Sequence, residues 1–465
     1  MPASDLRTRL QRLRLQKVKR GLPPSVPLDV VTVRSQARRI NHPTANAEPH
    51  TTLPGSEIVT RLGAYQLVEN YYPLDFTHGP RRLAEAFERD PLTAALLAKD
   101  EALAEADLRG LAFLDTETTG LAGGAGTLAF LVGVGLFEGE QFVLRQYFLR
   151  DPGEEQALLT ALVDDLSLRT GWVTFNGRAF DLPLLETRLV LNRQRGALGR
   201  KPHLDLLFPA RRLYRGRLES CSLGHLEQHV FNIVREQDDV PGYLIPQMYQ
   251  DYLRTGDPSE MHRVIYHNAM DILSMVTLTA HVLEIFATPF ESGRFKIQDS
   301  SSKSAARKPK AERGTQAPTS SFQPPAPNLQ PDDLLRLAQW HDDNDRPAEA
   351  ETAYTSALEG QLDLETRRAG LLRFAALLKR QDRRAEAAPL WEQLASFTLD
   401  DPEPFVELAK YYEWHTRDIS LAVKWAERAL AVVGSWPKGW KREEAKAELE
   451  HRLERLRGKR GSESQ

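Results

Sequence analysis

Hydrophobic positions along this chain of 465 residues are spaced in two different ways, and the change of spacing divides the chain. From about residue 108 to 288, short apolar runs typical of strands alternate with stretches of helical period. The predicted strands cover residues 111–116, 127–137, 141–149, 172–175 and 203–208, and the predicted helices cover 154–169, 182–192 and 261–286. Three early strands, followed by alternating helix and strand, predict an α/β mixed sheet flanked by helices.

A lead-in at about residues 55–105 precedes this region, with a predicted strand at 63–68 and a predicted helix at 81–103. The first 40 residues carry ten Lys and Arg against two acids, with leucines at helical spacing among the arginines. Such a basic amphipathic segment either grips a phosphate backbone, docks on a partner or is a solvated tail. The sequence leaves these three interpretations open.

A second change of pattern separates the α/β region from a helical one. Residues 292–331 are rich in Ser, Pro, Ala and Gln with a basic cluster, a composition that cannot bury a core. Beyond them the chain is helical and self-similar, since Arg346-Pro-Ala-Glu-Ala350 aligns with Arg383-Arg-Ala-Glu-Ala387 and loosely with Asp418-Ile-Ser-Leu-Ala422. The repeat is close to the length of a tetratricopeptide (TPR) helix pair, about 34 residues, and about three units would form a short solenoid. It either binds a protein partner or is plain helical packing.

We therefore expect four segments, each with its own composition. They are a basic, partly disordered N-terminal segment (1–50), an α/β domain with its lead-in (51–291), a disordered linker (292–331) and a separate all-α, TPR-like repeat domain (332–458). The length alone exceeds what one hydrophobic core normally serves.

Bulk composition narrows the class of protein. Hydrophobic residues make up 41% and charged residues 27%, which is typical of soluble globular domains, and the net charge of -3 identifies no partner. A single cysteine, Cys221, excludes an internal disulfide and a cysteine-based zinc site. The longest apolar run, 128–137, is too short to cross a bilayer, and the first residues lack the apolar core of a signal peptide. We expect a cytoplasmic protein with no membrane partner.

Two carboxylates end the first predicted strand of the α/β region. Phe113-Leu114-Asp115-Thr116-Glu117 places Asp115 and Glu117 two residues apart, so both side chains project from one side of the strand. Two anions held that close need compensation, and hard oxygen ligands suit Mg²⁺ or Mn²⁺. The alternative is a pair of solvated acids. The glycine-rich stretch that follows, 120–126, leads into a strand rather than a helix, so we interpret it as a flexible connection and not a phosphate loop.

Two later motifs supply further acids in the same region. Asp181 follows a predicted strand and begins a helix, where it acts either as a helix cap or as a ligand at the end of the sheet. His267 and Asp271 are four apart on the long predicted helix and share one face, as a surface hydrogen bond or as a catalytic pair. Four carboxylates with one imidazole match two-metal phosphodiester hydrolysis, in which the histidine would take the proton of water.

Together these motifs resemble a known family. Asp115-x-Glu117, Asn176-x-x-x-Phe-Asp181 and His267-x-x-x-Asp271 are similar to the three motifs of the DEDD (DnaQ-like) 3′–5′ exonucleases, whose fold is ribonuclease-H-like. The chain also resembles the bacterial YprB-like branch over roughly residues 55–288. The stretches that carry this likeness are Tyr71-Tyr-Pro-Leu, Cys221-Ser-Leu-Gly-His-Leu-Glu227, Asp239-Val-Pro-Gly242 and His267-Asn-x-x-Asp-Ile-Leu-Ser274.

The resemblance implies metal ligation by Asp115, Glu117, Asp181 and Asp271 and a general base at His267. In the family the histidine usually stands five residues before the last aspartate, whereas here Tyr266 holds that position and His267 the four-residue one. Helical geometry favours His267, because five residues turn a side chain well off the Asp271 face. Asp205 is either an outer ligand or structural, and we expect it to be structural.

Together with this resemblance, the sequence predicts an Mg²⁺- or Mn²⁺-dependent 3′–5′ exonuclease with two ions. The YprB-like resemblance implies DNA repair beside a helicase, hence DNA rather than RNA as substrate, and a helicase is the kind of partner the repeats would recruit. The alternatives are an RNA exonuclease, an endonuclease, or a catalytically silent scaffold that binds nucleic acid through the α/β domain and protein through the repeats.

Overall fold

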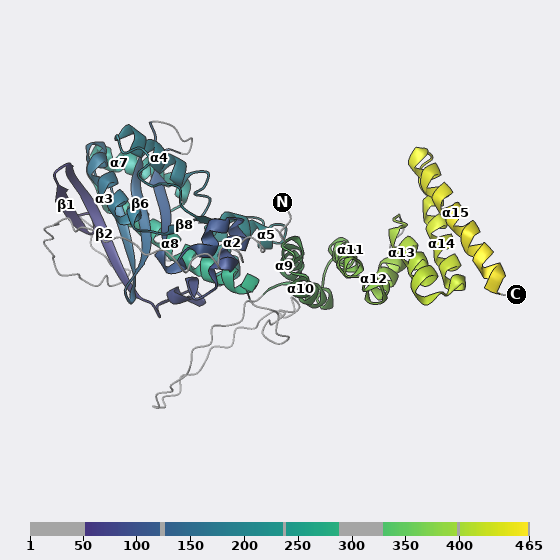
Figure 1. Ribbon diagram of the computed structural model, residues 1–465. Helices are drawn as coiled ribbons and strands as arrows, with labels where there is room; N and C mark the ends of the chain where they lie inside the picture. Colours follow the sequence, from purple (N-terminus) through teal and green to yellow (C-terminus); the bar gives the residue numbers. More distant parts are fainter. Residues whose placement is uncertain (1–51, 121–125, 236–238, 288–328, 398–399, 464–465) are drawn as a thin grey trace, which may run out of the picture. The chain divides into compact units, whose positions relative to one another are not determined.

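The computed structural model describes residues 52–120, 126–235, 239–287, 329–397 and 400–463. The basic N-terminal segment, nearly all of the predicted linker and the centre of the glycine-rich connection lie outside these residues. The chain divides into two compact units, and each is described here by itself. The first unit contains residues 52–287 and the second residues 329–463 among those described (Figure 1).

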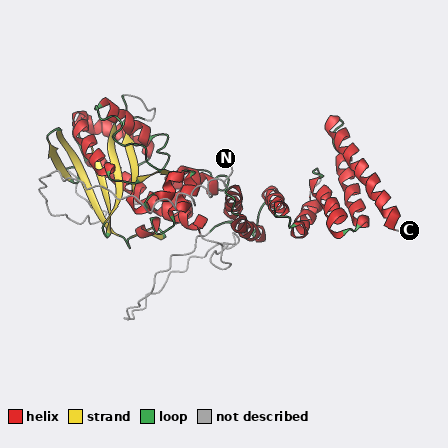
Figure 2. Ribbon diagram, viewed as in Figure 1, coloured by secondary structure: helices red, strands yellow, loops and turns green. Residues whose placement is uncertain are grey.

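A seven-stranded mixed sheet forms the centre of the first unit, as Figure 2 shows in yellow. Its order is β1-β2-β7-β6-β5-β8-β9, in which β5 pairs antiparallel with β6 and parallel with β8. The strands are β1 (Ser56–Thr60), β2 (Gly63–Pro73), β5 (Leu111–Thr118), β6 (Ala129–Glu138), β7 (Gln141–Phe148), β8 (Gly171–Thr174) and β9 (His203–Asp205). A two-stranded ribbon lies apart from the sheet, β3 (Thr77–His78) with β4 (Arg81–Arg82). The predicted mixed sheet flanked by helices is confirmed, and it has the ribonuclease-H-like arrangement.

Helices cover the sheet and supply the rest of the core. They are η1 (Leu83–Ala86), α2 (Pro91–Ala98), η2 (Glu101–Glu105), η3 (Leu108–Gly110), η4 (Pro152–Glu154), α3 (Glu155–Ser167), α4 (Asp181–Leu191), α5 (Leu207–Tyr214), α6 (Leu223–Leu226), the π-helical η5 (Glu227–Phe231), η6 (Gly242–Leu244), α7 (Ile245–Thr255) and α8 (Ser259–Ala287). By length and composition α8 could span a membrane, but 83% of its apolar window is buried within the protein, as in a core helix.

Close contact between α8 and β6 depends on two glycines. A Cβ atom at Gly133 would lie 2.3 Å from Oδ1 of Asn268, and one at Gly135 would lie 2.7 Å from Cγ2 of Ile272. Both neighbours belong to α8. Because these two positions of β6 have no side chain, the helix can cross the sheet directly beside β5. This approach places the polar residues of α8 at the end of β5.

The predicted helix at 81–103 is wrong, since this stretch forms β4 and three short helices. Asp90 and Asp100 each start a new turn, because their carboxylates accept hydrogen bonds from the backbone of Leu92 and Ala102. Lys99 takes a left-handed conformation (φ 53°) that ends α2.

The second unit is all helical. It consists of α9 (Pro331–Asp343), α10 (Pro347–Glu359), α11 (Leu364–Arg380), α12 (Arg384–Phe397), α13 (Glu403–Tyr411), the π-helical η7 (Tyr412–Thr416), α14 (Ile419–Gly434) and α15 (Trp440–Glu463). The three self-similar motifs fall at the starts of α10, α12 and α14, the second helix of each successive pair. The predicted all-α region is thus confirmed, while its assignment to the TPR class stays a prediction.

Candidate active site

Asp115 and Glu117 leave the end of β5 on the side that faces α8. Asn268, which is fully buried on α8, donates a hydrogen bond from Nδ2 to Oδ2 of Asp115 at 2.7 Å. Its Oδ1 accepts one from Nε2 of Gln146 at 2.9 Å, which fixes the orientation of the amide. Asp115 is therefore held in one position by a chain of buried amides that crosses from β7 to β5.

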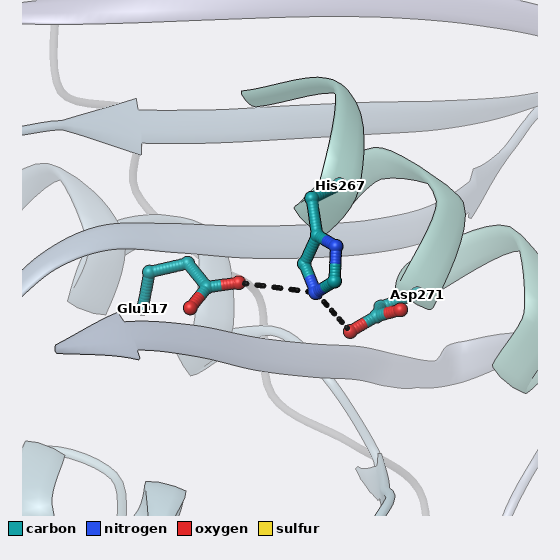
Figure 3. A group of neighbouring side chains, drawn as sticks. All are labelled: Glu117, His267 and Asp271. Atoms are coloured by element: carbon teal, nitrogen blue, oxygen red, sulfur yellow. Dashed lines mark ion pairs between the residues drawn. The ribbon is translucent and has the colours of Figure 1, made fainter. Parts of the chain in front are cut away.

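His267 and Asp271 meet Glu117 across the gap between α8 and β5 (Figure 3). Nε2 of His267 lies 3.6 Å from Oδ2 of Asp271 and 4.0 Å from Oε1 of Glu117. These three residues each offer one ligand atom within 4.8 Å of the other two, and Figure 3 shows the imidazole between the two carboxylates. The helical spacing that placed His267 and Asp271 on one face is thus seen in the structure.

The other ring nitrogen of His267 is bound to Asp239. The Nδ1–Oδ1 distance is 2.7 Å, while Nη1 of Arg235 lies 3.2 Å from the same nitrogen. Because the shorter contact is to a carboxylate, which only accepts, we assign the hydrogen to Nδ1. In the neutral ring Nε2 then holds the lone pair that points toward Glu117 and Asp271. Burial lowers the pKa of His267, but the hydrogen bond to Asp239 and the charge of Asp271 outweigh burial and raise that pKa overall.

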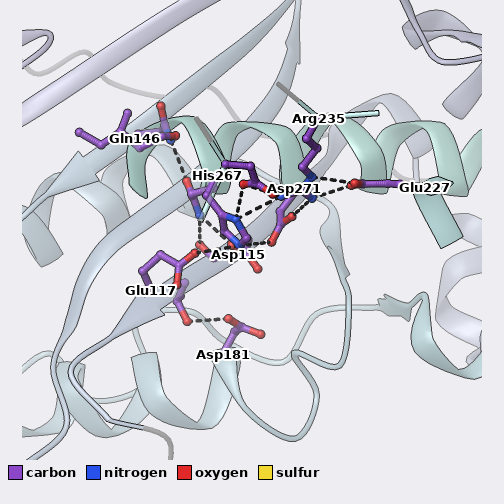
Figure 4. A network of polar contacts seen from close by, with 12 residues as sticks. Asp115, Glu117, Gln146, Asp181, Glu227, Arg235, His267 and Asp271 are labelled. Atoms are coloured by element: carbon purple, nitrogen blue, oxygen red, sulfur yellow. Dashed lines mark hydrogen bonds and ion pairs between the residues drawn. The ribbon is translucent and has the colours of Figure 1, made fainter. Parts of the chain in front are cut away.

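A buried arginine holds the other oxygen of Asp271 (Figure 4). Arg235 donates to Oδ1 of Asp271 from Nη2. It also forms a bidentate pair with Glu227, at 2.7 Å from Nε to Oε2 and 2.6 Å from Nη2 to Oε1. Glu227 is 1% exposed and belongs to the π-helical η5, a rare geometry often found at functional sites. Arg235 therefore orients Asp271 and leaves Oδ2 free to face the site.

Asp181 reaches β5 from another direction. Thr116, which by strand alternation points away from Asp115 and Glu117, donates a hydrogen bond to Oδ1 of Asp181 at 2.6 Å. A Cβ atom at Gly177 would lie 2.8 Å from the second carboxylate oxygen, so glycine leaves space for it. Figure 4 shows Asp181 apart from the other labelled acids. Burial raises the pKa of Asp181 to about 6, although the hydrogen bond from Thr116 opposes this effect.

Asp205 has a structural role, as expected. Its carboxylate accepts hydrogen bonds from the backbone N–H groups of Asn176 at 2.8 Å and Arg178 at 3.1 Å. These contacts fix the turn between β8 and α4 that presents Asp181. With both oxygens engaged by the backbone and only 3% of the residue exposed, Asp205 supports the site without belonging to it.

The carboxylates destabilise one another's charge. Burial raises the pKa of Asp115 and Glu117 well above the usual range, and the negative charges of Asp271 and Asp181 raise both further. Burial also raises the pKa of Asp271, although Arg235 and His267 oppose that shift. A set of oxygen donors with excess negative charge fits a divalent cation, because the ion would remove the repulsion that raises these pKa values.

Four residues at this site were not found by sequence reasoning as functional: Asn268, Glu227, Arg235 and Asp239. Asn268 adjoins His267, and Glu227 and Asp239 lie in stretches used for the family resemblance, but no spacing rule joined them to the acids. Arg235 had no local signal. Its guanidinium acts on Asp271, 36 positions later in the chain, and only the fold shows the pair.

Comparisons with known proteins agree with the fold. A family described as the RNase_H superfamily matches residues 112–283, which include every acid of the candidate site. A protein of Bacillus subtilis (strain 168), named as the uncharacterized protein YprB, is 31% identical over 379 residues that cover 77% of this chain and 79% of that protein. The chain therefore belongs to the family of the Bacillus subtilis protein YprB, with an RNase H superfamily domain of nuclease-like fold at residues 112–283.

Proposed function

We propose that this protein is a metal-dependent 3′–5′ exonuclease of the DEDD type that hydrolyses DNA by a two-metal mechanism. One observation carries the proposal, namely that Glu117, His267 and Asp271 offer ligand atoms within 4.8 Å of one another. Asp115 lies on the same side of β5, where burial and then the charges of Asp271 and Asp181 raise its pKa. The RNase H superfamily match supports a nuclease and a nucleic-acid substrate.

Each acid would take a separate part in cation binding. Glu117, Asp115 and Oδ2 of Asp271 would hold Mg²⁺ or Mn²⁺, and Asp181, whose charge acts on Asp115 and Glu117, would complete the set. Such ions, when bound, lower the pKa of an attacking water and stabilise the leaving 3′ oxygen. His267 would accept the proton of that water at Nε2, and Asp239 keeps the hydrogen on Nδ1 so that this lone pair remains available.

Arg235 and Glu227 are positioning residues in this proposal. Because Glu227 fixes two edges of the guanidinium, Arg235 keeps Asp271 in one rotamer whether or not a cation is present. Partners of this kind around metal ligands typically change affinity or activity by about 10- to 100-fold when removed. The charge of Arg235 also lowers the pKa values of Asp115, Glu117 and Asp271, and so offsets part of the effect of burial and mutual repulsion.

The choice of DNA, the repair setting and a helicase partner rest on the family resemblance. The second unit would recruit that partner through its repeats, and the basic segments outside the described residues would hold substrate through salt-sensitive phosphate contacts. A cytoplasmic location stays a prediction.

Purified full-length protein, incubated with 3′-labelled duplex DNA, single-stranded DNA or an RNA oligomer in Mn²⁺ or EDTA, tests the proposal. We expect release of labelled mononucleotide from DNA in Mn²⁺ and none in EDTA. Asp115→Ala and Asp271→Ala should lose activity equally, whereas Asp251→Asn, which changes an exposed acid of α7, should retain it.

Other outcomes would assign a different function. Cleavage of the RNA oligomer alone would make the protein an RNA exonuclease, and cleavage of a closed circular substrate would show endonuclease action. Binding without cleavage in any metal would leave the scaffold interpretation. Full activity in either alanine variant would remove the metal-ligand assignment.

A further inference from the structure

A cationic cavity of about 380 Å³ lies within the second unit. Its volume falls in the range of ordinary ligand sites, about 300–1,000 Å³. Side chains from α11, α12, α13, η7 and α15 line it: Lys379, Arg384, Glu407, Lys410, Trp414, His415 and Arg452. Four of these seven are Lys or Arg and one is a carboxylate, so the lining carries an excess of positive charge.

Buried glutamates hold the cations of this cavity in place. Glu407 is 5% exposed, and its two oxygens each accept from a lysine at 2.7 Å, Nζ of Lys379 and Nζ of Lys410. Behind the lining, the fully buried carboxylate of Glu413 binds three more cations: Arg452 at 3.2 Å, Arg455 at 2.7 Å and Lys459 at 2.8 Å. Two carboxylates thus position five cations.

An exposed aromatic ring stands among these charges. Trp414 is 58% exposed, with the guanidinium of Arg455 5.5 Å and the ammonium of Lys459 4.7 Å from its ring centroid. It belongs to the π-helical η7, which ends at Arg417 in a left-handed conformation (φ 60°). A π-helical turn in an otherwise α-helical unit is rare and typical of functional positions. Here it presents Trp414 beside Glu413, whose carboxylate holds the neighbouring cations.

We propose that this cavity binds single-stranded nucleic acid, with phosphates held by Arg384, Lys410 and Arg452 and one base stacked on Trp414. Cations that follow a backbone together with an aromatic platform are the general means of binding single strands. The inference rests on the proposed function only in the identity of the ligand, because the substrate of a nuclease is a polyanion that this protein would encounter.

The combination of groups favours an unpaired strand over other polyanions. An acidic peptide would satisfy the cations but would leave the exposed indole without a stacking partner. A duplex offers phosphates but keeps its bases paired and inaccessible to Trp414. A single strand supplies both phosphates and free base faces, and it is the form whose end a 3′–5′ exonuclease would hold.

Fluorescence anisotropy of a 5′-labelled 20-residue oligothymidylate with the full-length protein in EDTA tests this site without cleavage. Trp414→Leu should weaken binding about tenfold, within the contribution expected from stacking one base, and Trp414→Phe should restore part of it. Arg384→Gln should weaken binding a few-fold and reduce its salt dependence. Arg384 is the suitable cation, because its carboxylate partner, Asp382, is exposed and no buried glutamate loses its pair.

Matched controls lie on the same unit outside the cavity lining. Trp440→Leu removes another exposed tryptophan that also stacks with a lysine, and Arg457→Gln removes another exposed arginine. Both should bind the oligomer like the unchanged protein. Melting temperatures of all variants would show that each is folded.

Unchanged oligomer binding in both Trp414→Leu and Arg384→Gln would overturn the inference. So would tight, Trp414-dependent binding of a polyglutamate peptide without binding of the oligomer, since that result would make the cavity a protein-docking site. The Asp115→Asn protein separates this inference from the proposed function. Loss of cleavage with normal oligomer binding in that protein would support two distinct sites. If the unchanged protein cleaved nothing but bound the oligomer in a Trp414-dependent way, the cavity would still be a nucleic-acid site, and the proposed nuclease function would be wrong.

Discussion

Both units contain a π-helical turn with a buried glutamate that holds guanidinium groups, yet the surroundings of the two turns have opposite charge. In the first unit Glu227 holds Arg235, which binds Asp271 among three further acids. In the second unit Glu413 holds Arg452, Arg455 and Lys459 beside a cavity lined mainly by cations. In the two proposals above, the same local structure would serve two purposes: it would orient a ligand for a cation in one unit and present positive charge to an anion in the other.

The two sites differ in which sign of charge is left unbalanced. One arginine cannot balance the charges of Asp115, Glu117, Asp181 and Asp271, and the remaining negative charge fits the proposed binding of a cation. In the second unit the cations outnumber the buried carboxylates, and this excess of positive charge fits the proposed binding of an anion. Four changes would break or sharpen this comparison.

The largest effect is expected from the acids of the first unit. Asp115→Asn and Asp271→Asn should each lower exonuclease activity by about a thousandfold or more, because the ligands act as one unit. Single-turnover cleavage of a labelled single strand in Mn²⁺ measures the loss, while oligomer binding in EDTA should stay normal. If either variant cleaved at more than a tenth of the normal rate, the first site would not be the cation site that the comparison requires.

The second largest effect is expected from Asp239→Asn, which should lower exonuclease activity on the order of a hundredfold or more. The wrong imidazole tautomer is costly in comparable His–Asp pairs. The new amide would donate to Nδ1 of His267 and place the hydrogen on Nε2, where the proton of water must be accepted. The bond to Asp239 raises the pKa of His267, so the acid limb of the pH–rate profile should also move to lower pH in the variant. Partial recovery in Asp239→Glu is the control, and an unmoved profile would count against this role.

Changes at the two π-helical turns should affect different measurements, cleavage for the first turn and oligomer binding for the second. Arg235→Lys and Glu227→Gln should lower cleavage by about 10- to 100-fold, as for other partners of metal ligands, without weakening oligomer binding in EDTA. Glu413→Gln should weaken that binding a few-fold. Calorimetry would confirm folding, because a buried ion pair broken on one side destabilises a protein. Weaker oligomer binding in Glu227→Gln would mean that the two π-helical turns do not have separate roles.

Stability should depend on pH with a defined sign. The folded pKa of Asp181, about 6, lies above its unfolded value, as do those of Asp115 and Glu117, so ionisation destabilises the metal-free fold. The stabilising protonated state is present below pH 4 and is lost as pH rises through 6. His267 acts in the same direction, because its raised pKa adds stability that disappears when the ring deprotonates.

The measurement is thermal unfolding in EDTA and in Mn²⁺ at several pH values. Asp115→Asn should melt a few degrees above the unchanged protein in EDTA at pH 8, where about 1 kcal/mol corresponds to 2–4 °C. The difference should shrink at pH 5, and Mn²⁺ should stabilise the unchanged protein more at pH 8 than at pH 5. A lower melting temperature for Asp115→Asn at pH 8 would show that the acids do not repel one another.

Local sequence patterns were sufficient for the strand that carries Asp115 and Glu117 and for the helical face shared by His267 and Asp271. Period-two and period-four spacing acts over a few residues, so it can be read without the fold. The helix expected at 81–103 failed because Asp90 and Asp100 cap new turns, an effect stronger than the apolar period.

Long-range partners left no comparable pattern. Arg235 meets Asp271, and Arg452 meets Glu413, through tertiary packing alone. The π-helical turns also escaped prediction, because a single turn is too short to show a period of its own. The cationic cavity draws its side chains from five separate elements, so only the folded unit shows that they belong together.

The central claim is that acids from β5 and α8 hold a divalent cation, and direct binding tests it most closely. Electron paramagnetic resonance of free Mn²⁺, titrated with full-length protein at pH 8, measures the bound ions. We predict saturable binding that Asp115→Asn and Asp271→Asn each weaken at least tenfold and Asp251→Asn does not change. Equal Mn²⁺ affinity in all four proteins would contradict the claim.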